Sequence, residues 1–356
     1  MGFSGDPPPR TMGAMTSRGL LDRLRDAPAA ATDREALART VYGAVARHVA
    51  FDFACFATTD PATGLITWAS KTRDLGVGDE EFAATEYGPP DVNSFAEIAR
   101  RSPPVGVLSV DTAGRPQDCR RHREFMAPRF GFTDELRAVF VSRGATWGAL
   151  ALYRGPVDPP FTAAEGDQLA AVTEVVAEAV QRALFRLDPR TTSPDPGPAV
   201  LIVDAADQVT HLTAAAQHVI DELGGLDHSQ LPASLLAVVA DTRHRGEPRA
   251  TRTLGSSGTW LSLRAAPLHG PGGDGHVVLT AEPTPRSELS RLTLVAHGLT
   301  AREEEVALLV LQGASTRTIS ATLHLSPHTV QDHLKVVFTK LGVSSRREMT
   351  ARLVLD

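Results

Sequence analysis

The stretch LTAREEEVALLVLQGASTRTISATLHLSPHTVQDHLKVVFTKLGVSSRREM, residues 299–349, decides the fold of the C-terminal part of the chain. Thr300, with Glu303 three residues later, forms a capping box that predicts the start of a helix. Gly313 suits the left-handed backbone position that ends such a helix. We therefore expect a first short helix with its apolar residues on one face.

Three further helices are predicted by the same kind of signal. A cap at 315–316 begins a second short helix, and Ser326 followed by Pro327 is a strong start for a third, which we expect to run to about Lys340. Another capping box opens a fourth helix over about 345–353. Four short helices in fewer than 60 residues, with a tight turn between the second and the third, predict a helix-turn-helix unit.

The third helix carries a polar face opposite a stripe that we expect to be buried, formed by Val330, Leu334, Val337 and Leu341. A helix fits the major groove of DNA, with the side chains near its N-terminus on the base edges. Gln331 can form two hydrogen bonds with adenine, and Thr329 offers a hydroxyl or a methyl group. His333 can donate a hydrogen bond to a phosphate oxygen. The residues expected to neutralise phosphates are Lys335, Lys340, Arg346 and Arg347.

The distribution of charge agrees with this interpretation. From Ser315 to Asp356 six Lys and Arg stand against three Asp and Glu, a local charge of +3 in a chain whose formal net charge is -6. The overall charge excludes a uniformly basic nucleic-acid coat but leaves room for a local basic patch. The acidic run at 303–305 is expected to face away from DNA. A plain helical domain with a solvated polar face is the alternative, and the combination of features favours DNA binding.

These residues closely resemble the LuxR-type helix-turn-helix family. The pattern LTxRE, EV, a Gly after helix one, Ile in helix two, LxxSxxTV, HL and KLGVxSR is matched almost throughout, over about 50–58 residues. The resemblance implies a DNA-binding transcription regulator. It places Thr329 and Val330 where the family approaches bases, and it places three residues at backbone-contacting positions: His333, Lys335 and Lys340.

The sequence departs from this pattern at two positions of the third helix. Gln331 stands where many members carry Lys, and Asp332 stands where Asn or a neutral residue is common. Both residues lie on the polar face of the helix. We expect these differences to change the preferred base sequence rather than DNA binding itself.

The chain is long enough for two or three domains. It has 356 residues, of which 42% are hydrophobic and 22% are charged. We expect a multidomain α+β protein. The predicted segments are a disordered N-terminus at 1–16, a sensor domain at 17–187, a linker at 188–197, a second sheet domain at 198–285, a linker and helix start at 286–298, and the helix-turn-helix domain at 299–356.

The first of these domains is predicted to have a helix, then strands, then a long closing helix. The capping box of Thr162 and Glu165 opens a helix that we expect to run to about Leu187. This helix can pack against its own sheet or pair with a second copy, and we take it as the expected dimer element. The order of elements, and the stretch RPQDCRRHREFMAPRFGFTDELRAVFVSRGATWGALALYR at 115–154, resemble a GAF domain.

The second sheet domain, from VLIVDAADQVTHLT onward, is similar to a PAS domain. A phosphoreceiver domain is the more familiar partner of this type of helix-turn-helix. Receivers need a lysine late in the domain, and residues 72–334 contain none. Regulation by aspartyl phosphorylation is therefore not expected, and both domains are interpreted as α/β sensor modules.

No catalytic set, metal site or cofactor motif is predicted. Cys119 with His122 three residues later is better explained by a surface helix than by haem or bilin attachment. Glu135 has no carboxylate partner at a fixed spacing. The chain is therefore expected not to be an enzyme. An unidentified small-molecule ligand of the sensor domain is left open.

The sequence thus predicts a DNA-binding transcriptional regulator controlled by GAF-like and PAS-like domains. Double-stranded DNA is the expected partner, bound by a homodimer, and RNA polymerase is a further candidate. The alternative is a small-molecule sensor whose C-terminal unit docks a protein or dimerises. Only two cysteines and no stretch of 18 apolar residues occur, so we expect a cytoplasmic location and no membrane contact.

Overall fold

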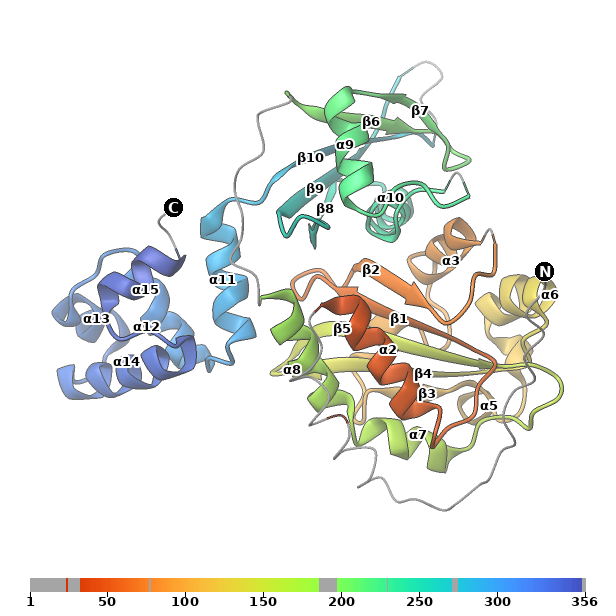
Figure 1. Cartoon of the computed structure of the whole chain (residues 1–356), viewed down its shortest axis with the longest axis horizontal. Coiled ribbons are helices and arrows are strands. Elements are labelled where there is room, and N and C mark those ends of the chain that lie inside the picture. The colour runs from red at the N-terminus through yellow and green to blue at the C-terminus, as the bar shows by residue number, and fades with distance from the viewer. Residues whose placement is uncertain are drawn as a thin grey trace.

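The computed structural model describes residues 24, 33–76, 78–185, 197–228, 230–270 and 275–353. The predictions for the N-terminal 16 residues and for most of the linker at 188–197 lie outside the described residues. Figure 1 shows two sheet-containing lobes and a helical lobe, with one helix between the helical lobe and the rest. The predicted multidomain α+β class is confirmed.

The first sheet has five antiparallel strands in the order β2-β1-β5-β4-β3. The side chains of each strand point alternately to the two faces of the sheet, and both faces are covered. This explains why β4 and β5 are buried along almost their whole length. The strands that the sequence predicted between the first helix and the closing helix are present. The strands are β1 Phe53–Thr59, β2 Ile66–Lys71, β3 Val105–Val107, β4 Asp134–Ser142 and β5 Ala145–Arg154.

Helices cover both faces of this sheet (Figure 1). On one face α2, Arg34–Val45, and α8, Thr173–Leu184, bury their apolar stripes. Asp33 begins α2, where its carboxylate accepts from the Ala36 backbone N–H at 2.8 Å. The short helices that follow β2 and precede β4 are α3 Asp79–Glu86, α4 Phe95–Ile98, α5 Leu108–Asp111, η2 Pro116–Asp118, η3 His122–Met126 and α6 Ala127–Phe130.

The predicted long helix from 162 to 187 is wrong in one respect, because it is two helices. The capping box at Thr162 is present and opens α7, Ala163–Ala170, but the chain turns at 171–172 before α8 begins. The turn lets Val172 point into the core with only 2% of its surface exposed. The apolar stripe of α8 lies against its own sheet, so it is not free to pair with a second copy.

The segment around Cys119 is also corrected, because it is buried rather than a surface helix. Cys119 is fully buried and lies 3.3 Å from the Asp91 carboxylate. The neighbouring Arg121 is fully buried too and pairs with Glu135, whose other oxygen accepts from Arg137 at 2.7 Å. Although burial raises the pKa of Glu135, the two guanidinium groups outweigh it and lower the pKa to about 2. Buried charges need such partners, so this network holds the segment to β4.

The second sheet has the same strand order as the first, β7-β6-β10-β9-β8. The sequence predicted a sheet domain at 198–285, and these residues form one. Helices α9 and α10 cover one face of the sheet. The elements are β6 Ala199–Val203, β7 Val209–Leu212, α9 Ala214–Glu222, α10 Ala233–Arg245, β8 Arg249–Leu254, β9 Trp260–Pro267 and β10 Val277–Pro283.

The two sheet domains meet along a closely packed junction. The Asp60 carboxylate, 1% exposed, pairs with Arg252 at 2.9 Å. The Phe185 ring, at the end of α8, stacks on Trp260 with 5.2 Å between centroids. Helix α10 packs against α3 and β2 as well as against its own sheet. A buried ion pair and a shared apolar contact therefore fix the second domain on the first.

A complete helix, α11, Arg286–Ala296, occupies the region predicted as a linker and helix start. Four helices follow it, as predicted, and they surround a separate apolar core (Figure 1). They are α12 Ala301–Leu311, α13 Thr316–Leu323, α14 Pro327–Leu341 and α15 Arg346–Leu353. None of the helices within the described residues is both long and apolar enough to cross a membrane.

Candidate nucleic-acid interface

The tight turn between α13 and α14 orients the third helix of the C-terminal domain. His324 ends α13 in the left-handed region, with φ 53°. Two residues later the Ser326 hydroxyl accepts from the Thr329 backbone N–H at 3.1 Å and begins α14. Pro327 occupies the first helical position, where a missing N–H costs nothing. These local signals place α14 across α12 and α13, as the sequence predicted.

Val330 faces the core of this domain and not the solvent. It is fully buried, as are Ile319 and Val337, while Leu334 is 2% exposed. The buried stripe predicted for this helix is confirmed at Val330, which belongs to the apolar core of the domain. The position close to the bases that the resemblance implied for Val330 is therefore wrong for this structure. The close packing makes the helix a rigid support for the residues on its other side.

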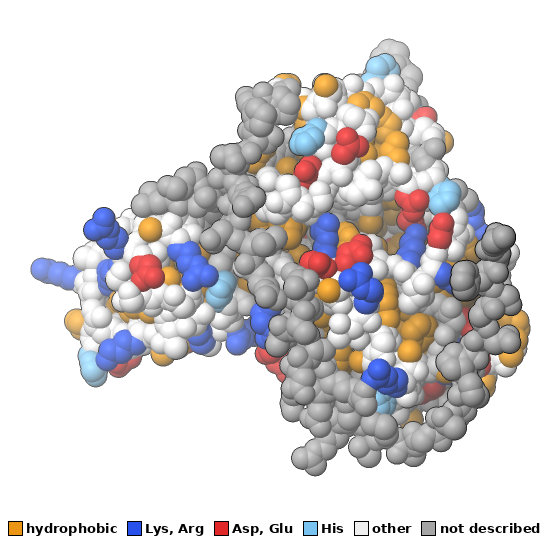
Figure 2. All heavy atoms as spheres, in the orientation of Figure 1, with side chains coloured by type: hydrophobic (Ala, Val, Ile, Leu, Met, Phe, Trp, Pro, Cys, Tyr) orange, Lys and Arg blue, Asp and Glu red, His pale blue; other side chains and the backbone are white. Residues whose placement is uncertain are grey.

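The opposite side of α14 is polar and open to solvent. Gln331 and Asp332 are exposed, and Lys335 keeps 78% of its side-chain surface exposed. The Lys335 ammonium lies 3.8 Å from Asp332, an exposed pair that contributes little. His333 and Thr329 are half-buried at the edges of this face. Figure 2 shows Lys and Arg side chains distributed over the helical lobe.

Lys340 differs from Lys335 because it is held inside the domain. Its ammonium donates to the Glu303 carboxylate at 2.6 Å and to the Gly298 carbonyl at 3.0 Å. Burial raises the pKa of Glu303, but the bonds from Lys340 and from the Thr300 backbone N–H outweigh it and hold the pKa below its usual value. The acidic start of α12 thus binds the end of α14. Lys340 joins two helices, a role that its place in the sequence did not reveal.

Arg346 also has partners inside the domain. Its guanidinium donates to the Ala314 carbonyl and to the Thr316 hydroxyl, each at 2.9 Å. The Gln331 amide donates to the same hydroxyl at 3.3 Å. Arg346 therefore fixes the loop before α13 beside the exposed face of α14. Arg347 is exposed and has no ion-pair partner among the described residues.

Two residues of this surface were missed by the sequence analysis. Thr316 receives bonds from both Gln331 and Arg346, and Arg317 is exposed at the start of α13. In helix-turn-helix proteins the helix before the reading helix crosses the DNA backbone, so a cation at its start suits a phosphate. The Ser315 cap was the available signal, because it fixes which residues form the first turn of α13.

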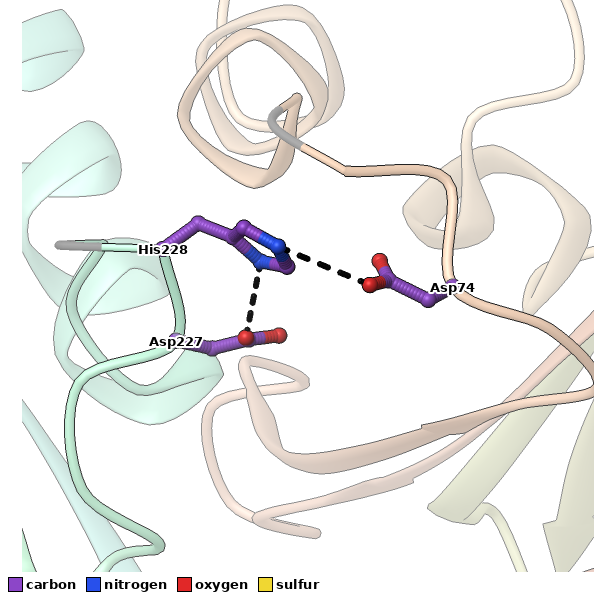
Figure 3. Close-up of side chains that lie close together, drawn as sticks. All are labelled: Asp74, Asp227 and His228. Atoms are coloured by element: carbon purple, nitrogen blue, oxygen red, sulfur yellow. Dashed lines mark ion pairs between the residues drawn. The ribbon is translucent and has the colours of Figure 1, made fainter. Parts of the chain in front are cut away.

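The junction between the two sheet domains holds a separate polar group, shown in Figure 3. The His228 ring lies 2.9 Å from the Asp227 carboxylate and 3.6 Å from that of Asp74, which belongs to the other domain. Such donors suit a divalent cation, but all three side chains are exposed. We assign them a polar contact between the domains and no metal.

Four short helices around one core, with a tight turn before a helix that exposes a polar face, define a helix-turn-helix protein. The family model described as "Bacterial regulatory proteins, luxR family" matches residues 297–353. Spore germination protein GerE of Bacillus subtilis is 38% identical over 56 residues, which is 16% of this chain and 76% of that protein. The chain belongs to the luxR family of bacterial regulatory proteins.

Other relatives match the chain over stretches of similar length. A putative HTH-type transcriptional regulator of Mycobacterium bovis is 45% identical over 64 residues, 18% of this chain and 7% of that protein. The monoamine regulon transcriptional regulator of Klebsiella aerogenes is 41% identical over 54 residues, 15% of this chain and 24% of that protein. The chain thus spans a small part of these relatives. Their descriptions as transcriptional regulators agree with the prediction that the chain is not an enzyme.

Two solved structures resemble the chain over longer stretches. SdiA of Escherichia coli, with 10% identity and a TM-score of 0.32, covers 95% of this chain and 97% of its own. A VqmA–ligand–DNA complex from Vibrio cholerae, with 17% identity and a TM-score of 0.24, covers 43% of this chain and 80% of its own. At these scores neither likeness carries an argument about the two sheet domains.

Proposed function

We propose that this protein is a sequence-specific DNA-binding transcriptional regulator whose α14 reads the major groove. The observation that carries the proposal is the exposed polar face of α14 opposite a fully buried stripe. In the proposed complex Gln331 and Thr329 meet base edges, while His333, Lys335 and Arg347 meet phosphates. Lys340 and Arg346 support this surface from within the domain.

We also propose that residues 17–187 and 198–285 act as GAF-like and PAS-like sensor domains that control residues 299–356. Helix α11 supports this part of the proposal because it belongs to two cores at once. Leu289 and Leu292 pack into the core shared with the first sheet, whereas Leu294 packs into the core of the C-terminal helices. A shift of the first domain would therefore move α11, and with it Leu294 in the core of the C-terminal helices.

A second contact joins the first sheet to the C-terminal domain. The Arg143 guanidinium, in the turn between β4 and β5, lies against Gly298, where a side chain would collide with it. Gly298 has φ 73° and its carbonyl accepts from Lys340. The turn of the sensor sheet thus touches the backbone that anchors the end of α14. Through this contact, a movement of the first sheet would act directly on the end of α14.

The proposed regulator acts as a homodimer on DNA, in the cytoplasm, with RNA polymerase as its partner at the promoter. One helix-turn-helix domain covers too little DNA for high specific affinity, so two domains are needed. Because the stripe of α8 is buried in its own domain, the dimer contact is proposed outside that helix.

The test is fluorescence-anisotropy titration of the full chain against its own upstream DNA over a salt series, with a scrambled duplex as the comparison. We expect preferential binding that weakens steeply with salt. The variant Lys335→Ala should reduce the slope of log K against log salt by about one. Arg182→Ala removes an exposed cation from α8 and is the matched control, with an unchanged slope. Equal slopes for the two variants would contradict the proposal and favour a docking module.

A further inference from the structure

An apolar cavity of about 80 Å³ lies where the two sheet domains meet. Its inner wall is aromatic and comes from the first domain. The opposite wall comes from α10 of the second domain, through Ala233, Leu236 and Ala237. Neither domain encloses this space alone. The rings that line it are Phe53, Phe82, Phe125, Phe130 and Tyr153.

One end of the cavity is polar. The Lys71 ammonium pairs with the Asp79 carboxylate at 2.6 Å, and both side chains are partly exposed. The same two residues line an open groove on the outside, so they stand at the mouth of the cavity. Burial raises the pKa of the Cys55 thiol in the cavity wall to about 12, so this thiol is uncharged. The mouth therefore offers one donor and one acceptor, and the interior offers no charge.

Small residues keep the space open. Gly78 lies on its edge, and a Cβ there would come within 3.1 Å of the Phe130 ring. Ala69 on β2 and Ala237 on α10 also line the cavity, and neither brings a large side chain into it. The walls are held in place by contacts such as that of Asp79, whose backbone N–H donates to the Gln230 side chain at 3.4 Å. The cavity therefore lies in a junction whose two domains are held together by contacts close to it.

We propose that this cavity binds a small aromatic molecule of one ring that carries a single hydroxyl group. An apolar cavity of about 150 Å³ takes up benzene. This cavity has about half that volume, so it can bury only part of a single ring, and the edge that carries the hydroxyl group lies in the open mouth. The hydroxyl group can donate to Asp79 and accept from Lys71 without bringing a charge into the interior. Because both domains form the walls, the ligand binds only when they are docked.

Titration calorimetry of the full chain with p-cresol tests this proposal, with toluene as the ligand that lacks the hydroxyl group. We expect binding of one p-cresol per chain and an affinity for toluene weaker by about tenfold, the cost of one unmade hydrogen bond. Equal affinities would overturn the role of Lys71 and Asp79. Absence of p-cresol binding would overturn the site.

Two variants fill the cavity from opposite domains. Ala237→Phe enters from α10 and Ala69→Phe enters from β2, and each should abolish p-cresol binding. Ala214→Phe, at an exposed position of α9, is the matched control and should bind like the wild type. A thermal melt identifies any variant that fails to fold, and the other wall then carries the test. Normal binding by a folded Ala237→Phe variant would overturn the assignment of α10 as a wall.

The effect of the ligand on DNA rests on the proposed function, whereas its binding does not. Anisotropy with the upstream duplex, with and without saturating p-cresol, measures that effect separately. A change in DNA affinity in the wild type, absent in Ala237→Phe, would support a regulatory site. Ligand binding without DNA binding would contradict the proposed function and leave the cavity assignment intact.

Discussion

Replacing Lys335 and replacing Lys340 on α14 should affect different properties of the protein. Lys335 is 78% exposed, whereas Lys340 is bonded to Glu303 and to the Gly298 carbonyl. We expect Lys335→Ala to reduce the salt dependence of DNA binding and to leave stability unchanged. Lys340→Ala should lower stability and leave the salt slope unchanged.

The magnitude follows from the contacts of Lys340. A hydrogen bond to a charged group contributes about 1.5–3 kcal/mol. The Lys340 side chain keeps 29% of its surface exposed and Glu303 keeps 10%, so solvent weakens the pair in part. We therefore expect Lys340→Ala to lower the free energy of unfolding of the C-terminal domain by about 1–2 kcal/mol.

Urea denaturation and anisotropy over a salt series provide the two readouts. Lys340→Arg keeps the charge and serves as the control for the salt slope. Glu303→Gln should lower stability by a similar amount, and the double variant should cost less than the sum because both changes remove the same pair. A Lys340→Ala variant of wild-type stability whose salt slope is smaller by about one would refute this reasoning.

Three more predictions follow from buried and exposed residues. Glu135 is bound to Arg121 and Arg137, and its pKa is lowered to about 2. The free energy of unfolding should therefore fall by on the order of 3 kcal/mol as pH drops from about 4.5 to 2. Thermal melts from pH 7 to pH 2.5 should show most of this loss, and the Glu135→Gln variant should show a flatter dependence on pH. Val330→Ala should lower the unfolding free energy by about 2 kcal/mol in urea, because it empties part of a closed core, and a stable variant with altered base preference would contradict its place there. Gln331→Ala should weaken discrimination at one base pair by about 1–3 kcal/mol with an unchanged salt slope, measured with duplexes substituted at each position.

The C-terminal helices could be predicted from the sequence because their ends are determined locally. Thr300, Ser326 and Gly342 each adopt the cap or left-handed position that their residue type favours. Capping depends on side chains within three or four residues, so distant parts of the chain do not alter it. The strands of the first domain were predicted as well, but their order in the sheet depends on contacts between residues far apart in the sequence.

Other features depend on residues far apart in the sequence, and only the tertiary structure decided them. The two sheets share one strand order although no repeat is visible in the sequence. Lys335 and Lys340 look alike in sequence, but Glu303, 37 residues before Lys340, holds only the second. A charged side chain that pairs with a residue distant in the sequence is no longer free to bind DNA. The residues next to it in the sequence do not predict such a pair.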